Sequence, residues 1–150
     1  MKATIEKMTE KDRESVREMM RTFYASPAVL SNGSEEIFEN DINYCVGDSP
    51  YLEGYVFRDK QEALGYAMAA KSFSTEYGKP CVWIEDLYIK AEHRGEGLGG
   101  QFLKFIEEKY ADCVLRLEAE GDNERALGVY KKHGYEILPY TELIKRKKTN

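Results

Sequence analysis

Four glycines stand close together in the segment AEHRGEGLGGQF, which covers residues 91–102. An apolar periodic segment begins behind them and predicts an amphipathic helix that runs to about Tyr110. Backbone N–H groups in the first turn of a helix have no partner inside the helix, and glycine lets a phosphate approach them closely. A loose turn needs only one glycine, and Arg94 adds a full positive charge beside the four. The segment therefore predicts an anion site at the mouth of this helix.

The glycines alone leave the phosphate ligand open. Gly95, Gly97 and Gly100 satisfy the G-x-G-x-x-G pattern of dinucleotide-binding folds, and Glu118 or Glu120 follows about twenty residues later. Two features count against a Rossmann-type NAD site. The polar segment KAEHR separates the strand from the first glycine, and the late position of the motif leaves no room for the second half of a doubly wound fold. The P-loop pattern, G-x-x-x-x-G-K followed by Ser or Thr, does not occur in the sequence.

Composition predicts one domain over residues 1–150, with 42% hydrophobic residues available for a core. No apolar run of membrane-spanning length occurs and the N-terminal segment lacks the apolar core of a signal peptide, so we expect a cytoplasmic protein with no membrane contact. The three cysteines are odd in number and far apart, which disfavours disulfides and a zinc cluster, and we expect no metal.

Acidic charge dominates the chain apart from its end. The net charge is −5, but without the basic run Lys145–Lys148 there remain 18 basic residues against 27 acidic ones, a net charge near −9. Such a surface repels nucleic acid phosphates and favours cationic small molecules as partners. We therefore expect no nucleic acid partner, and we interpret the short basic run as a solvated end.

The elements that position the glycine segment are indicated by periodicity and turn residues. A strand is predicted over residues 2–8 and is followed by a helix that starts at Thr9 and Asp12 and reaches about Tyr24. A second helix is predicted over residues 35–46, with Ser34 as its N-cap. Further predicted elements are strands over 51–57 and 62–73 joined by the turn 58–61, a strand over 80–90, the helix behind the glycines, a strand over 113–120, a helix from Asn123 to Gly134 and a last strand over 135–146. The order β α α β β β α β α β predicts an α/β (α+β) fold with a mixed, partly antiparallel sheet flanked by helices.

Two motifs in the chain resemble the acetyl-CoA-binding signature of the GNAT superfamily of N-acetyltransferases. In the family a strand leads into Arg or Gln, two residues, Gly, one residue and then Gly or Ala, which Arg94, Gly97 and Gly99 fill. The second part of the family pattern is present as Asn123, Ala126, Tyr130, Gly134 and Tyr135. The resemblance covers roughly residues 80–140, and the order of elements in the whole chain is similar to the GNAT fold.

This resemblance implies that acetyl-CoA is the co-substrate and that main-chain groups hold it. The pyrophosphate would be bound by N–H groups of the glycine loop, residues Arg94, Gly95, Glu96, Gly97, Leu98, Gly99 and Gly100. The preceding strand would splay from its neighbour and expose backbone groups of Leu87, Tyr88 and Ile89 to pantetheine and to the thioester carbonyl, as an oxyanion donor. Asn123, Ala126 and Tyr130 would complete the coenzyme site, with Asn123 also expected as a helix cap.

The resemblance also implies one acid and one base. Tyr130 matches the general acid of the family, which protonates the departing thiolate. An attacking amine must lose a proton, and in WIEDLYI the candidates are Glu85 and Asp86. Strand alternation predicts that these two side chains lie on opposite faces, and we choose Glu85 because it matches the base of some relatives, notably spermidine and spermine acetyltransferases. His93 and His133 are alternatives only on general grounds.

The acceptor side of the chain is acidic. Residues 22–57 contain no lysine or arginine but six acids: Glu35, Glu36, Glu39, Asp41, Asp48 and Glu53. These acids suit a polyamine-like cationic amine or form a solvated helix face. The expected function is direct transfer of the acetyl group to a primary amine of a small acceptor through a tetrahedral intermediate. The rivals are a non-catalytic acyl-CoA sensor on the same fold and an NAD-binding protein. The resemblance is also compatible with a homodimer.

Overall fold

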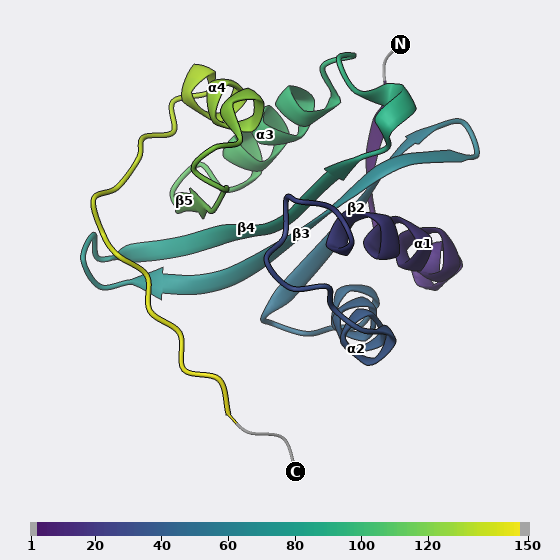
Figure 1. The fold of residues 1–150 in the computed structure, drawn as a ribbon, viewed down its shortest axis with the longest axis horizontal. Coiled ribbons are helices and arrows are strands. Elements are labelled where there is room, and N and C mark those ends of the chain that lie inside the picture. Colours follow the sequence, from purple (N-terminus) through teal and green to yellow (C-terminus); the bar gives the residue numbers. More distant parts are fainter. Residues whose placement is uncertain (1–2, 148–150) are drawn as a thin grey trace.

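The computed structural model describes residues 3–147 (Figure 1). Its elements are β1 Thr4–Lys7, η1 Glu10–Asp12, α1 Arg13–Tyr24, α2 Glu35–Val46, β2 Leu52–Asp59, β3 Glu62–Ser74, β4 Lys79–Ile89, η2 Ala91–His93, α3 Leu98–Lys109, β5 Val114–Leu117 and α4 Glu124–Lys132. This arrangement confirms the predicted mixed α/β fold and the predicted order of elements as far as α4. Residue 2 of the predicted first strand lies outside the described residues, as does Lys148 of the basic run.

The five strands form one sheet in chain order, β1-β2-β3-β4-β5. Neighbouring strands from β1 to β4 are antiparallel, whereas β5 runs parallel to β4. The β4–β5 ladder extends only from the pair Cys81–Val114 to the pair Ile84–Leu117. Beyond Ile84, strand β4 pairs only with β3, as far as Ile89. Strands β4 and β5 are therefore no longer paired after Ile84.

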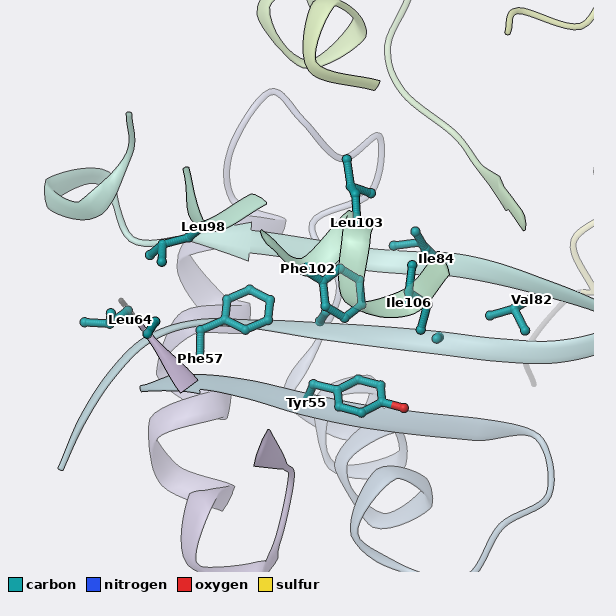
Figure 2. Close-up of a cluster of buried hydrophobic side chains, with 12 residues drawn as sticks. Tyr55, Phe57, Leu64, Val82, Ile84, Leu98, Phe102, Leu103 and Ile106 are labelled. Carbon is teal, nitrogen blue, oxygen red and sulfur yellow. The ribbon is translucent and has the colours of Figure 1, made fainter. Parts of the chain in front are cut away.

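Helices cover both faces of the sheet, α1 and α2 on one side and α3 and α4 on the other (Figure 1). On the α3 side, Phe102 and Ile106 point from the helix towards Tyr55 and Phe57 of β2 (Figure 2). The Phe57 and Phe102 ring centroids are 5.5 Å apart. Because α3 is apolar at helical spacing, burying this stripe fixes the helix against the sheet and sets the position of its first turn.

A second cluster of buried side chains joins α1 and α2 to the opposite face of the sheet. It includes Met20 of α1, Ile42 of α2 and Tyr66 of β3, all fully buried. The predicted caps are present: Thr9 and Asp12 form a capping box at the start of η1, which leads directly into α1, and the Ser34 hydroxyl accepts a hydrogen bond from Ile37 N–H at 3.2 Å at the start of α2. Local capping and burial therefore agree on where these two helices begin.

The predicted last strand, residues 135–146, is wrong for this structure. The chain after α4 is irregular as far as Lys147, and it passes the turn between β3 and β4, where the Tyr140 hydroxyl donates to Glu76 (Figure 1). Strand-like composition needs a neighbouring edge to become a strand, and this segment does not pair with β5 of its own chain. Among residues 3–147, no helix is both long enough and apolar enough to cross a membrane.

Candidate active site

The glycine segment forms a tight entry to α3. Gly95 has φ of 84° and Gly97 has φ of 83°, backbone conformations that side-chain-bearing residues rarely adopt. Gly97 is the N-cap of α3, and its carbonyl accepts the hydrogen bond from Gln101 N–H at 3.0 Å. The Gln101 amide in turn donates to the Ala3 carbonyl at 2.7 Å, which ties the start of α3 to the start of the sheet. The two glycines are thus explained by the turn itself.

Gly99 has no such structural requirement. It lies in the first turn of α3 without a left-handed φ, and a Cβ added there meets no atom within 4 Å. A Cβ added at Gly100 would come within 3.1 Å of the His133 ring. Packing therefore accounts for Gly100, while the bare backbone at Gly99 faces open space at the positive end of a helix.

Other residues of the loop have partners within the chain. The Arg94 Nε donates to the Ile89 carbonyl at 2.9 Å, and its guanidinium lies 5.7 Å from the centroid of the Tyr88 ring. Arg94 is thereby held at the end of β4, next to the first turn of α3. Leu98 is buried in the core below the loop, while Glu96 is exposed. The loop fits a phosphate-bearing ligand because it offers helix N–H groups and a cation, with no acidic residue in the first turn of α3.

Residues Leu87, Tyr88 and Ile89 lie where the splayed strand was expected. They pair with Ala67, Tyr66 and Gly65 of β3. On the other side, the ladder with β5 has already ended at Ile84 and Leu117. An opening between β4 and β5 therefore begins next to Glu85, and main-chain groups of β4 border it.

A β-bulge in β4 changes the faces of the two candidate bases. Met68 pairs with Asp86 and the next residue, Ala69, pairs with Ile84, so Glu85 is the extra residue. Before the bulge Val82 and Ile84 pack on the α3 side, whereas Leu87 and Ile89 pack there after it. The face that alternates with them therefore carries Glu85 and Asp86 together. The prediction that these carboxylates lie on opposite faces is wrong, because alternation is reset at the extra residue.

Asp86 is the more confined of the two carboxylates. Its exposed fraction is 5%, and it accepts hydrogen bonds from the Tyr66 hydroxyl at 2.7 Å and from the Tyr24 hydroxyl at 3.0 and 3.1 Å. Burial raises the pKa of Asp86, although these hydrogen bonds act in the opposite direction. Tyr24 comes from α1, so this network joins α1 to the middle of β4.

Glu85 is accessible by comparison. Glu85 as a whole residue is exposed to solvent. Partial burial of its carboxyl group and the neighbouring charges of Asp86 and Glu142 nevertheless raise its pKa above the ordinary value. A carboxylate with a raised pKa is a better proton acceptor than a free one, provided that the pH lies above that pKa. Both properties suit Glu85 to the expected role of base.

A cavity of about 310 Å³ opens at the bulge, on the α1 and α2 side of the sheet. Its lining residues are Tyr24, Asp41, Tyr44, Tyr51, Leu52, Met68, Ala70, Glu85 and Asp86. It therefore holds three carboxylates and three tyrosines, with no lysine or arginine in its lining. Burial and the charges of Asp86 and Glu85 raise the pKa of Asp41 to about 6.

The acidic stretch contributes less to this cavity than its composition suggested. Of the six acids between residues 22 and 57, only Asp41 lines the cavity. Glu35 pairs with Arg21, Glu39 with Arg13 and Arg17, and Glu53 with Lys71 and two tyrosine hydroxyls. The cavity tyrosines were not identified individually from the sequence, because aromatic residues at helix ends and in loops carry no periodic signal.

The remaining candidates lie on the α3 side. Asn123 caps α4 as expected, accepting from Ala126 N–H at 3.3 Å. The side chain of Tyr130 packs against the α3-side core beside Tyr135, with ring centroids 6.2 Å apart, and burial raises its pKa. Tyr130 is therefore protonated at neutral pH, as a general acid must be. His93, placed between Glu62 and Glu96, and His133, bonded to the end of α4, do not line the cavity.

Comparisons with known proteins concern the family and the fold of this chain. A thialysine N-epsilon-acetyltransferase of Bos taurus is 35% identical over 82 residues, which are 53% of this chain and 48% of that protein. The chain thus spans about half the length of this relative. A possible acetyltransferase from Clostridium difficile 630 has the same fold, with a TM-score of 0.84, 14% identity and coverage of 98% of this chain and 99% of that one.

A further solved structure with this fold is AAC(6')-Iy in complex with a bisubstrate analogue, CoA-S-monomethyl-acetylneamine. Its TM-score is 0.79 at 13% identity, with 98% of this chain and 99% of that chain covered. The profile of the acetyltransferase (GNAT) family matches residues 14–135. That range contains the glycine loop, the bulged strand and α4, and it is most of the chain. The chain belongs to the GNAT family of acetyltransferases.

Proposed function

We propose that this chain is an acetyl-CoA-dependent N-acetyltransferase that acts on a primary amine of a small cationic acceptor. The observation that carries the proposal is the bulge at Glu85. It places two carboxylates in an acidic cavity on one side of β4, directly beside the opening between β4 and β5. The glycine loop follows at the end of the same strand. A base for an amine, Glu85, and a cradle for phosphates, residues 94–100, are therefore nine to fifteen residues apart along one strand and its loop.

Backbone groups supply the binding of the co-substrate in this proposal. N–H groups of residues 94–100 hold the pyrophosphate, with Arg94 as the nearby cation and Asn123 and Ala126 at the start of α4 as further contacts. Acetyl-CoA supplies an acetyl group already activated as a thioester. N–H groups of Leu87, Tyr88 or Ile89 at the opening stabilise negative charge on the carbonyl oxygen.

Glu85 and Tyr130 move the two protons. Glu85 accepts the proton of the attacking amine because it is accessible in the cavity and has a raised pKa, whereas Asp86 is occupied by two tyrosine hydroxyls. Tyr130 donates a proton to the thiolate that leaves. Asp86 acts on the reaction through its charge, which strengthens Glu85 as a base.

The charge of the cavity selects the acceptor. Asp41, Glu85 and Asp86 share one cavity without a lysine or arginine in its lining, and their pKa values are all raised. An acceptor with a second positive charge relieves this repulsion when it binds, while a neutral acceptor leaves the carboxylates unpaired. We therefore infer a diamine or polyamine-like acceptor, whose second ammonium lies near Asp41.

The test is thiol release from acetyl-CoA with matched acceptors. The pair 1,4-diaminobutane and 1-aminobutane differs in one terminal ammonium group, and thialysine and spermidine extend the panel. We expect the diamine to exceed the monoamine in kcat/KM by about tenfold or more, equivalent to about 1.4 kcal/mol. Asp41→Asn should reduce that ratio, and Glu36→Gln, an acid outside the cavity, should not.

Two outcomes would contradict the proposal. Equal kcat/KM for the diamine and the monoamine would contradict the preference for a cationic acceptor, but it would not contradict acetyl transfer itself. Calorimetric binding of acetyl-CoA without thiol release for any amine would instead indicate an acyl-CoA sensor.

A further inference from the structure

His93 lies between two carboxylates that come from different parts of the chain. Its Nδ1 is 3.3 Å from Oε1 of Glu96 in the glycine loop, and its Nε2 is 3.3 Å from Oε1 of Glu62 at the start of β3. The side chain of His93 is only 14% exposed. A neutral imidazole has one N–H and can donate to one of the two carboxylates, whereas an imidazolium donates to both. The geometry therefore favours the protonated form of His93.

The charges around His93 favour the same form. Within residues 3–147, Glu62 and Glu96 are the charged groups at ion-pair distance from its ring, and Glu92 lies on η2 itself. Partial burial lowers the pKa of His93, but the hydrogen bonds to the two carboxylates and their charges outweigh this effect, so the pKa is raised above its ordinary value. Because the ordinary pKa of histidine lies just below neutrality, such a rise places its titration in the physiological range.

The segment from Gly95 to Gly97 has few contacts other than the one to His93. Among the described residues, its three N–H groups make no hydrogen bond to the backbone. Arg94 before it is bound to the Ile89 carbonyl, and α3 begins directly after it. Glu96 carries the one side chain of this segment, and that side chain is bound to His93. The contact between His93 and Glu96 therefore holds the part of the loop whose N–H groups are free to bind a phosphate.

Glu96 also places a negative charge in a loop that we expect to bind phosphates. It is the only acidic residue between positions 94 and 100 of the sequence. A carboxylate without a cationic partner would repel a phosphate at this position. The ion pair with protonated His93 compensates the charge of Glu96, and the contact of His93 with Glu62 anchors this pair on β3.

We propose that His93 is a positioning residue for the co-substrate. As an imidazolium it bridges Glu62 and Glu96, which holds the glycine loop in place and cancels the charge of Glu96. When His93 loses its proton, one carboxylate loses its hydrogen bond and the charge of Glu96 is no longer compensated, so the affinity for coenzyme A falls. This inference rests on the proposed function, because it requires that the glycine loop binds the phosphates.

The pH dependence of coenzyme binding tests this role. Dephospho-coenzyme A is the probe, because it keeps the diphosphate but lacks the 3′-phosphate monoester, which itself titrates near neutral pH. In calorimetric titrations the Kd should rise about threefold to fivefold from about pH 6 to about pH 9, as expected for the loss of a partly exposed charge pair. A wild-type Kd that does not change with pH overturns the role of His93.

Three variants identify the groups responsible. His93→Gln carries no charge, so its Kd should be the same at both pH values and close to the wild-type Kd at the higher one. Glu96→Gln should also lack the pH dependence, because His93 acts through Glu96. The control Glu92→Gln removes a carboxylate of η2 that is not paired with His93, and it should keep the wild-type pH dependence.

Each variant also has a result that contradicts the proposal. If His93→Gln keeps the wild-type pH dependence, another group is responsible for it. If the Kd of Glu96→Gln still rises with pH, His93 acts on the phosphates directly and the role of Glu96 is wrong. Absence of binding at every pH, for the wild-type chain as well, would instead refute the glycine loop as the phosphate site and with it the proposed function.

Nitrogen NMR of the histidine rings gives a second readout on the wild-type chain. The sequence contains only two histidines, so the signal that is missing in His93→Gln assigns His93. Dephospho-coenzyme A should move the titration of His93 to higher pH, because the coupling between a bound proton and a bound ligand is reciprocal. A titration that stays unchanged or moves to lower pH when the ligand binds overturns the proposal.

Discussion

Gly99→Ala separates what the fold needs from what the co-substrate needs. Gly99 lies in the first turn of α3, its φ is not left-handed, and a Cβ there meets no atom of the chain within 4 Å. Alanine restricts the unfolded chain and favours the helix by up to about 1 kcal/mol, less at a helix end than in its middle. The free energy of unfolding should therefore rise by about 0.5 kcal/mol, a shift in Tm of about 1–2 °C.

The same methyl group should weaken the binding of acetyl-CoA. It occupies the open space through which a phosphate would approach the helix N–H groups, and a hydrogen bond to a charged group contributes about 1.5–3 kcal/mol. We expect the Kd for coenzyme A to rise by roughly tenfold to a hundredfold. Calorimetric titration measures this Kd, and thermal unfolding of the same samples measures Tm.

Gly128→Ala is the matched control. Gly128 lies within α4, and an added Cβ there also meets no atom within 4 Å. It is two residues from both Ala126 and Tyr130, so at 100° per residue it faces away from the side of α4 that they share. This variant should gain about 1 kcal/mol of stability and keep its affinity for coenzyme A. A stabilised Gly99→Ala variant with unchanged affinity would refute the phosphate cradle.

Three further substitutions test the site. Asp86→Asn removes a charge that raises the pKa of Glu85, so the rise of kcat/KM with pH should move to lower pH. If this limb of the pH profile did not move, Glu85 would not be the base. The pKa of Asp41 is raised from 3.8 to about 6. This carboxyl group therefore contributes stability that is complete below about pH 4, where it is protonated, and that is lost as the pH rises through about 6. Asp41→Asn should therefore increase the unfolding free energy at about pH 8 by about 1 kcal/mol, discounted for partial exposure, with no gain at about pH 4 in urea titrations. Tyr130→Phe should lower kcat by about a hundredfold with little change in affinity for coenzyme A. The control Tyr135→Phe removes a buried hydroxyl that has no hydrogen-bond partner among the described residues, and it should leave kcat unchanged. Equal effects of the two substitutions on kcat would exclude Tyr130 as the acid.

Local sequence signals anticipated most of the framework. The helix caps at Ser34 and Asn123 and the capping box at Thr9 were predicted because each depends on residues within three positions of one another. The turn conformations at Gly95 and Gly97 follow from residue type in the same way. Runs of strand-forming residues between turn residues sufficed to predict the strands from β1 to β5.

Contacts between segments that are far apart in the chain could not be predicted in this way. The six-acid stretch could not reveal that Asp41 alone lines the cavity, because Glu35 and Glu39 are paired with arginines of α1 that only packing brings close. Strand-like composition over residues 135–146 led to a wrong prediction, since a strand is defined by its partner edge and not by its own residues.

The sequence by itself determined where the turns and helix caps lie and which side chains are buried, and the spacing of its glycines identified the glycine loop. Glu85 and Tyr130 became candidates through the resemblance to the GNAT family. Only the tertiary structure decided which candidates face one another. The extra residue at Glu85 appears only in the register of β4 against β3, and it turns both carboxylates into one cavity. The physical reason is that a bulge is a property of two strands together: it depends on how Met68 and Ala69 pair across the ladder, which is not encoded in the alternation of either strand alone.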